Sequence, residues 1–417
     1  MDFHATFFIE RNDFMSMNST PKGERLHIAL FGRRNAGKSS LINAITGQDL
    51  AIVSDVKGTT TDPVYKAMEL LPLGPVMLID TPGLDDEGTL GEERVKKARS
   101  VLNKTDIALI VVDGAQAQRD FSFEETIIDL VKKKNIPSII VLNKQDEWSQ
   151  QESELSSFGD LCVSAKSGYH IHELRELMAK KIPSEEPTGR LIGDLLSPLD
   201  MVVLVIPIDA AAPKGRLILP QQQTIRDILE SGAIPVVCRD TELSDTLNKL
   251  GTKPKLVVTD SQAFGPVSKL VPEEIPLTSF SILFSRYKGD LEEQLKGVQA
   301  LLSLKNGDKI LMAEGCTHHR QCGDIGTVKL PTWIREYTKQ DFIFDTCSGG
   351  GFPEDLTDYK LIVHCGGCTL SKKEMAFRIN EAKDQQVPIV NYGTLIAHLK
   401  GVLKRSIEPF EDYRNRI

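Results

Sequence analysis

The sequence predicts an α/β protein made of three domains, the first of which has a doubly wound parallel sheet. A chain of 417 residues is too long for one ordinary hydrophobic core. Short apolar stretches suited to buried strands alternate with amphipathic stretches suited to helices. A segment that combines proline, charge and glycine, PSEEPTG at 183–189, is typical of a linker. We therefore predict an N-terminal tail and three domains with the bounds 1–22, 23–184, 190–259 and 260–417.

The composition excludes several classes of protein. Hydrophobic residues make up 41% of the chain and charged residues 26%, as in ordinary globular proteins. The net charge of -8 disfavours general nucleic-acid binding, so we expect no nucleic-acid partner. No run of about eighteen apolar residues occurs, and the tail lacks a signal-peptide layout, so we expect a cytoplasmic protein without a membrane partner. In a reducing cytosol, the seven cysteines favour metal binding or catalysis over disulfides.

The first domain begins with a strand, a glycine loop and a helix, RLHIALFGRRNAGKSSLINAITG. Within it, residues 32–39 fit the pattern G-x-x-x-x-G-K-[ST], whose backbone N–H groups and following helix form an anion cradle. Lys38 would reach the β- and γ-phosphates, and the Ser39 hydroxyl would bind Mg²⁺. The predicted phosphate-contacting residues are Gly32, Asn35, Ala36, Gly37, Lys38, Ser39 and Ser40.

Further motifs follow in the order that a GTPase needs, each at the end of a strand. In VMLIDTPGLDD, the Asp80 carboxylate can hold Mg²⁺ through water, and the Gly83 N–H can meet the γ-phosphate. In IPSIIVLNKQD, the Asp146 carboxylate can accept two N–H groups of guanine and so reject adenine. LCVSAKSG offers a contact to the guanine carbonyl. The predicted guanine-side residues are Asn143, Lys144, Asp146, Ser164, Ala165 and Lys166.

This first domain resembles the translation-factor-like GTPases, and more narrowly the TrmE/Era-like G domains of tRNA-modification and ribosome-assembly proteins. By that resemblance, Thr60 in KGTTTDP is the Mg²⁺-binding threonine of switch I, with Thr59 as the alternative. Lys38, Thr60 and Gly83 are then the predicted catalytic groups of a GTPase that converts GTP to GDP and phosphate.

Two positions in this domain bear on the rate of hydrolysis. Leu84 stands where a Ras-like protein has the glutamine that orients the attacking water, so hydrolysis should be slow or depend on another group. In the resembling G domains, an asparagine at the position of Asn35 helps to bind an activating K⁺ that takes the place of an arginine finger. The alternative is that Asn35 only tolerates a turn conformation.

Residues 190–259 alternate strand, helix, strand, helix and strand. This unit is small for an independent core, and its valine- and isoleucine-rich strands invite completion of the sheet by a second copy. We therefore expect a dimerisation domain and a homodimer. The alternative is that the unit simply packs on its neighbours.

The last domain places cysteines where strands end. We expect strands in SFSILFSR (279–286), in DKILMAEG leading into Cys316, and in YKLIVHCGGC leading into Cys365. Residues at the carboxyl ends of parallel strands share one edge of a sheet, so two motifs far apart in the chain can meet there. We expect Cys347, in DTCSGGGFPEDL, to lie in a loop outside the ligand set.

The predicted metal ligands are Cys316, Cys365 and Cys368, and a histidine could fill a fourth place. The candidates for that place are His318, His319 and His364. Three thiolates and one imidazole suit Zn²⁺ in a closed tetrahedral site. Three thiolates with an exchangeable fourth ligand suit a [4Fe–4S] cluster. The spacing alone leaves both metals open.

The GTPase motifs together with Cys316-Thr317-His318 and His364-Cys365-Gly366-Gly367-Cys368 resemble the [FeFe]-hydrogenase maturation GTPases of the HydF family. The likeness covers nearly the whole chain from about Gly23. It implies a [4Fe–4S] cluster on the three cysteines and a scaffold that receives a di-iron precursor made with radical-SAM maturases. The scaffold then delivers the precursor to the apo-[FeFe]-hydrogenase. The competing interpretation is a zinc-containing, ribosome- or RNA-associated GTPase.

Overall fold

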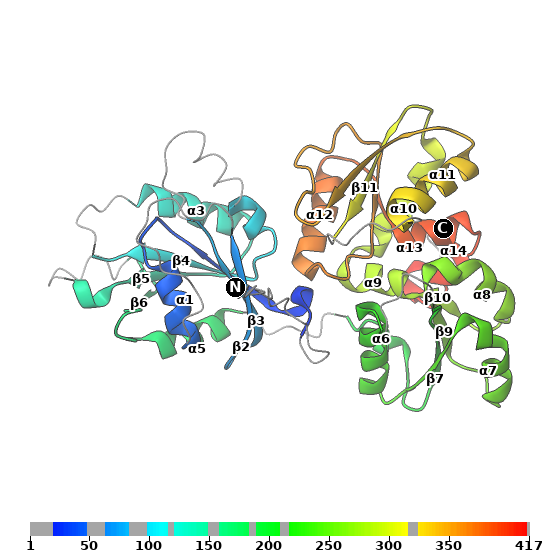
Figure 1. Cartoon of the computed structure of the whole chain (residues 1–417), viewed down its shortest axis with the longest axis horizontal. Coiled ribbons are helices and arrows are strands. Elements are labelled where there is room, and N and C mark those ends of the chain that lie inside the picture. The colour runs from blue at the N-terminus through cyan, green and yellow to red at the C-terminus, as the bar shows by residue number, and fades with distance from the viewer. Residues whose placement is uncertain are drawn as a thin grey trace, which may run out of the picture.

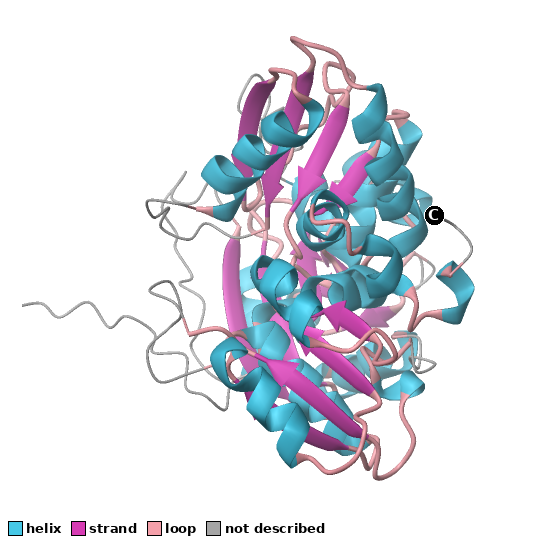
Figure 2. Ribbon diagram, turned by 90° about the vertical axis from the view of Figure 1, so that its right-hand side faces the viewer, coloured by secondary structure: helices cyan, strands magenta, loops and turns pink. Residues whose placement is uncertain are grey.

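The computed structural model describes residues 20–47, 63–82, 98–115, 121–148, 158–182, 189–208, 217–315 and 324–414. The described strands form three separate sheets, of six, four and four strands (Figure 1). Helices lie on both sides of the strands (Figure 2). The prediction of an α/β fold with three units is therefore confirmed. No helix within these ranges is both long and apolar enough to cross a membrane.

The first sheet has the strand order β2-β3-β1-β4-β5-β6. Its strands are β1 (Leu26–Phe31), β2 (Val64–Leu70), β3 (Gly74–Asp80), β4 (Ile107–Asp113), β5 (Ser138–Asn143) and β6 (Leu161–Cys162). Its helices are α1 (Lys38–Thr46), α3 (Ser122–Lys133) and α5 (Ile171–Lys181). Successive residues of β1 pack into cores on opposite faces, Leu30 into one and Phe31 into the other, as in a doubly wound sheet. The edge strand β2 runs antiparallel to β3, so the sheet is mixed rather than wholly parallel.

The second sheet has the order β10-β9-β7-β8, with all neighbours parallel. Its strands are β7 (Met201–Val205), β8 (Ile234–Cys238), β9 (Leu256–Thr259) and β10 (Leu277–Ser279). The helices are α6 (Leu219–Glu230), α7 (Leu243–Lys249) and α8 (Phe264–Leu270). Because β10 belongs to this sheet, the sheet continues past the boundary predicted at residue 259.

The strand predicted over 279–286 is wrong. Only Leu277–Ser279 is a strand, and Phe280–Lys288 forms helix α9. Ser279 is the N-cap of α9, and its hydroxyl accepts a hydrogen bond from the Ile282 N–H at 3.3 Å. An apolar run this short suits either a strand or a buried helix, and the cap decides for the helix.

The third sheet has the order β12-β11-β13-β14, again all parallel. Its strands are β11 (Lys309–Glu314), β12 (Ile343–Ser348), β13 (Leu361–His364) and β14 (Ile389–Asn391). The helices are α10 (Leu291–Ala300), α11 (Leu330–Thr338), α12 (Lys372–Asp384), α13 (Tyr392–Leu399) and α14 (Leu403–Ile407). Cys347, expected in a loop, lies on the edge strand β12, directly beside Ala313 of β11.

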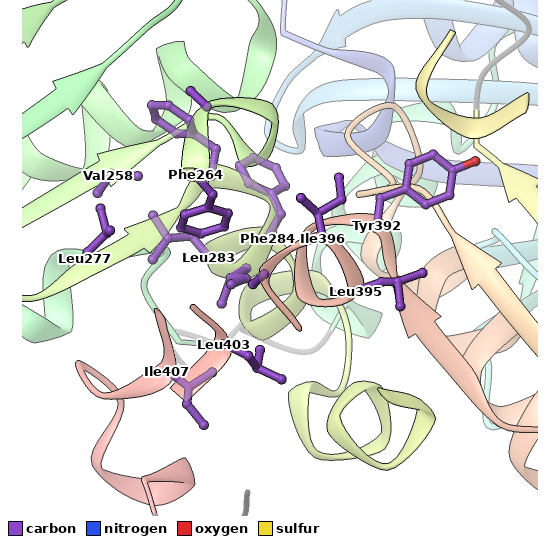
Figure 3. Packing of buried hydrophobic residues seen from close by; sticks show 14 of the residues in the cluster. Val258, Phe264, Leu277, Leu283, Phe284, Tyr392, Leu395, Ile396, Leu403 and Ile407 are labelled. Atoms are coloured by element: carbon purple, nitrogen blue, oxygen red, sulfur yellow. The ribbon is translucent and has the colours of Figure 1, made fainter. Parts of the chain in front are cut away.

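The second and third sheets share one hydrophobic core, which runs from Leu191 to Phe410. Figure 3 shows part of it, where Phe284 of α9 lies near Ile396 of α13. The two units are therefore joined by packing as well as by the chain.

Polar contacts also join the first domain to the third. Lys373 of α12 donates to the backbone oxygen of Thr105 at 3.2 Å, and its Nζ lies 3.6 Å from an Asp106 carboxylate oxygen. At Gly23, an added Cβ would lie 2.5 Å from the Leu370 carbonyl oxygen, so the chain entering β1 lies directly against the loop that follows Cys368.

Candidate functional site

The phosphate loop connects β1 to α1, and its shape depends on residues with a left-handed backbone. Asn35 has φ 60° and Gly37 has φ 88°. A Cβ on Gly37 would lie only 2.3 Å from the Asn143 Nδ2, so this position requires glycine. Lys38 is 8% exposed, and its Nζ donates to the carbonyl oxygens of Gly32 at 2.9 Å and Arg33 at 2.8 Å. The Lys38 side chain therefore folds back along the phosphate loop, where it was predicted to contact the β- and γ-phosphates.

The two predicted oxygen ligands for Mg²⁺ that lie within the described residues are in contact. The Ser39 hydroxyl, in the first turn of α1, donates to an Asp80 carboxylate oxygen at 2.6 Å, at the end of β3. Burial raises the pKa of Asp80, while the Ser39 hydrogen bond and nearby Lys38 lower it. Hydroxyl and carboxylate oxygens are the ligands that Mg²⁺ takes from proteins beside phosphates, so these residues fit that ion. Thr60 and Gly83 lie outside the described residues.

Asn143 joins the phosphate loop to the guanine-side motif. Its Nδ2 donates to the Ala36 carbonyl oxygen at 3.0 Å, and its Oδ1 accepts from the Ala165 N–H at 3.1 Å. Because both polar atoms of this buried amide are hydrogen-bonded, the Asn143 side chain links the phosphate loop to the guanine-side motif. The adjacent Lys144 has a left-handed backbone, and its Nζ lies 2.6 Å from an Asp113 carboxylate oxygen.

Asp146 is held by the third motif. The Ser164 hydroxyl donates to its Oδ1 at 2.5 Å, and the Lys166 ammonium lies 3.8 Å from its Oδ2. The Ser164 hydrogen bond, helped by the charge of Lys166, holds the pKa of Asp146 below its usual range. An ionised carboxylate only accepts hydrogen bonds, as the recognition of two guanine N–H groups requires.

Cys365 follows β13 and faces backbone donors. Its own N–H donates to the Ala313 carbonyl oxygen of β11 at 2.9 Å. Its sulfur accepts from the N–H of Gly315 at 3.1 Å and of Gly367 at 3.4 Å. Gly367 has φ 61°, a conformation in which glycine is unstrained. A cysteine sulfur that accepts two N–H groups at the carboxyl edge of a sheet fits a metal–sulfur group, and hydrogen bonds of this kind stabilise such centres.

Cys368 lies at the other end of the same short loop. The buried Lys288 of α9 donates to the carbonyl oxygens of Cys368 at 3.3 Å and Leu370 at 3.1 Å. Burial raises the pKa of the Cys368 thiol above its ordinary value, and the charge of Lys288 offsets only part of this rise. Lys288 therefore fastens the second half of the Cys-Gly-Gly-Cys loop to the core.

His364, a predicted candidate for the fourth ligand, has both of its ring nitrogens in hydrogen bonds in this structure. It is fully buried, and its Nε2 lies 3.0 Å from Nη1 of Arg378. A guanidinium only donates, so Nε2 is the acceptor, and Nδ1 carries the proton that is donated to the Cys365 carbonyl oxygen at 2.7 Å. Burial, together with the charge of Arg378, lowers the pKa of His364 to about 3. The imidazole is neutral, and both of its nitrogens are occupied.

The remaining predicted ligands, Cys316 and His318, lie outside the described residues. Within the ranges that the structure does cover, no three His, Cys, Asp or Glu side chains lie close enough together to hold a metal ion. Arg378 was not among the residues predicted from the sequence; it comes from α12 and meets His364 only through folding. No local motif marks this arginine.

Comparison with known families separates the chain into three matched segments. Residues 27–144 match the model described as 50S ribosome-binding GTPase. Residues 191–289 match the hydrogen maturase F dimerization domain, and residues 292–409 match the hydrogen maturase F tetramerization domain. The two last models together match more than half of the chain, and the second spans the sheet that bears Cys365 and Cys368.

Two individual relatives are each similar to less than half of the chain. GTPase Der from Wolinella succinogenes is 34% identical over 186 residues, which cover 41% of this chain and 38% of that protein. The tRNA modification GTPase MnmE from Heliobacterium modesticaldum is 31% identical over 167 residues, covering 38% of this chain and 35% of that one. The chain thus spans less than half of the length of these relatives. Among solved structures, Era from Aquifex aeolicus bound to GDP.AlF4- gives a TM-score of 0.34 at 21% identity, covering 58% of this chain and 97% of that one. The first domain is a P-loop GTPase domain.

Proposed function

The chain belongs to the hydrogen maturase F family, and from this premise we propose that it is the GTP-hydrolysing scaffold on which the di-iron subcluster of [FeFe]-hydrogenase is carried. In this proposal, the third domain binds a [4Fe–4S] cluster, and the first hydrolyses GTP. The observation that carries the proposal is the Cys365 sulfur, which receives two backbone N–H groups at a sheet edge in a chain that also contains a GTPase domain.

In the first domain, Lys38 and the loop N–H groups would bind the β- and γ-phosphates of GTP, and Asp146 would bind guanine. Ser39, Asp80 and Thr60 would hold Mg²⁺, which when bound neutralises charge on the phosphates. The contact between the Ser39 hydroxyl and an Asp80 carboxylate oxygen, which lie 2.6 Å apart, supports this role. Gly83 would meet the γ-phosphate through its backbone N–H.

We also propose that K⁺ activates hydrolysis through Asn35. The left-handed backbone of Asn35, with φ 60°, supports either a turn role or a cation role. The two are separated by measuring GTP turnover in KCl and in NaCl at equal ionic strength. Faster turnover in KCl supports the cation role, and Asn35→Asp or Asn35→Ala should remove the difference. Equal turnover in the two salts would leave Asn35 with the turn role alone.

In the third domain, Cys316, Cys365 and Cys368 would bind three irons of the cluster. The fourth iron would be open or held by a replaceable group such as His318. His364 is not proposed as a ligand, because Arg378 and the Cys365 carbonyl oxygen use both of its nitrogens. An open iron would allow a guest di-iron unit to bind, and the unit would then pass to the apo-hydrogenase. Its makers, radical-SAM maturases, would be the other partners.

We propose a homo-oligomer as the working form. The edge strand β8 of the second sheet leaves Ile234 at 43% and Val237 at 48% exposure, and an unpaired apolar edge invites strand pairing. The family models that match here describe a dimerization and a tetramerization domain. A second copy pairing along β8 would bury these side chains.

The decisive experiment for the cluster is anaerobic reconstitution with iron and sulfide, followed by EPR of the reduced protein. We expect broad visible absorption and a reduced-cluster signal in the natural protein. Cys316→Ser, Cys365→Ser and Cys368→Ser should each lose or strongly alter the signal. Cys238→Ser, on strand β8, is the matched control and should keep it. A colourless protein with one tightly bound zinc would instead favour the ribosome- or RNA-associated GTPase.

A further inference from the structure

Tyr392 lies at the same sheet edge as Cys365. The parallel strands β13 and β14 pair His364 with Asn391, so Cys365 and Tyr392 are the next residues along two neighbouring strands. Tyr392 begins α13, and its side chain is 8% exposed. Figure 3 shows its ring at the border of the shared core, with the phenolic oxygen pointing away from Leu395 and Ile396. The hydroxyl is therefore directed out of the apolar core while remaining buried.

The Tyr392 hydroxyl has no hydrogen-bond partner among the described residues. The space around it is narrow, because a Cβ on Gly326 would lie 2.3 Å from the hydroxyl oxygen and 2.6 Å from Oε1 of Glu314. A tyrosine hydroxyl can donate its own hydrogen as well as accept one, so an unpaired Tyr392 hydroxyl is an available donor. A buried hydroxyl without an acceptor is costly, and most such groups in proteins have a partner.

The surroundings of this donor indicate what kind of acceptor is missing. Cys365 follows the strand that neighbours the one leading into Tyr392, and its sulfur already accepts N–H groups from Gly315 and Gly367. A further buried donor without a partner at this sheet edge suits an acceptor of concentrated negative charge. Thiolate and sulfide sulfurs of a metal cluster have this property.

We propose that, in the cluster-loaded protein, the Tyr392 hydroxyl donates a hydrogen bond to anionic sulfur at the Cys365 site, either the iron-bound Cys365 thiolate or a sulfide of the cluster. This inference rests on the proposed function, because it needs the cluster. Tyr392 is then a positioning residue that tunes the cluster without binding iron. A hydrogen bond to sulfur stabilises the reduced, more negative form more than the oxidised form, so it raises the reduction potential.

The test is Tyr392→Phe, which removes one oxygen and keeps the ring that packs in the core. Tyr337→Phe is the matched control, because the Tyr337 hydroxyl already pairs with the His398 imidazole at 3.1 Å. The two variants and the natural protein are reconstituted anaerobically, and the midpoint potential of each is measured by EPR-monitored redox titration. We expect a more negative potential in Tyr392→Phe, an unchanged potential in Tyr337→Phe, and a normal iron content in both.

Melting temperature provides a second measurement that does not depend on activity. In the cluster-free protein, Tyr392→Phe should not lower the melting temperature, since it removes a hydroxyl that has no acceptor. In the reconstituted protein, the same substitution should lower it. An unchanged potential in Tyr392→Phe would overturn the inference. An equal loss of melting temperature in the cluster-free and reconstituted proteins would also overturn it, because the hydroxyl would then be hydrogen-bonded to a protein group that does not need the cluster. If the natural protein takes up no cluster, the proposed function fails as well. If the natural protein takes up the cluster and Tyr392→Phe changes neither the potential nor the melting temperature, only the inference about Tyr392 fails.

Discussion

Acidification should weaken the cluster-free fold through His364. The imidazole is buried and neutral, and its pKa is lowered from 6.5 to about 3, first by burial and then by the charge of Arg378. Between these two pH values, the unfolded chain binds a proton on this histidine that the folded chain does not. The contribution of His364 to the free energy of unfolding is therefore fully present above the pKa of the unfolded chain, and it decreases as the pH falls toward the pKa of the folded protein.

The size of the effect follows from the pKa difference. Each unit of difference corresponds to about 1.4 kcal/mol. Moving from pH 7 to pH 5 crosses roughly one and a half units below the unfolded pKa, so this histidine alone should cost about 2 kcal/mol of unfolding free energy. That is a large part of the about 5–15 kcal/mol by which proteins are usually stable.

The assay is urea unfolding of the cluster-free protein at pH 7, 6 and 5, followed by circular dichroism. Carboxylates also titrate in this range, so the comparison is with His364→Gln, whose amide can donate to the Cys365 carbonyl oxygen and accept from Arg378 but does not titrate. We expect the natural protein to lose about 2 kcal/mol more than His364→Gln between pH 7 and pH 5. If the free energy of unfolding depends on pH in the same way in the two proteins, the interpretation of His364 as a buried neutral imidazole with hydrogen bonds at both nitrogens is refuted.

Three substitutions give further tests. Gly37→Ala should weaken GTP binding by about tenfold or more in titration calorimetry, because its Cβ would lie 2.3 Å from a buried amide; Gly74→Ala, with a similar φ of 80° and open space, should not. Asp146→Asn should exchange a preference for GTP for one for XTP in competition assays, since an amide offers one acceptor and one donor; an unchanged preference would contradict its role. Arg378→Met should cost about 3–5 kcal/mol in urea unfolding because it leaves buried partners unpaired, against about 1 kcal/mol or less for Arg335→Met at an exposed ion pair; similar losses would contradict this.

The sequence alone predicted those features that are local in the chain. The phosphate loop is a strand, a loop and a helix in succession, so its glycines, Lys38 and Ser39 are recognisable without any distant contact. The alternation of apolar strands and helices likewise predicted the α/β class, because a sheet covered by helices on both faces needs continuous apolar strands. The Cys-Gly-Gly-Cys loop, although its metal stays a proposal, was also visible as a short motif.

The tertiary structure decided features that depend on which distant segments pack together. Whether the short apolar run 279–286 became strand or helix was settled by the Ser279 cap and the core against which α9 packs. The edge strands β2 and β12 carry no strong alternation, and they form because a neighbouring strand presents unpaired backbone groups.

The histidine next to Cys365 illustrates the same limit at the level of one side chain. From the sequence, His364 was a candidate ligand, because a histidine beside a cysteine has the chemistry of one. In the fold, Arg378 approaches from α12 and takes the nitrogen that a metal would need. A motif states which atoms are available along the chain, but hydrogen bonds from residues brought close only by folding determine which lone pairs remain free.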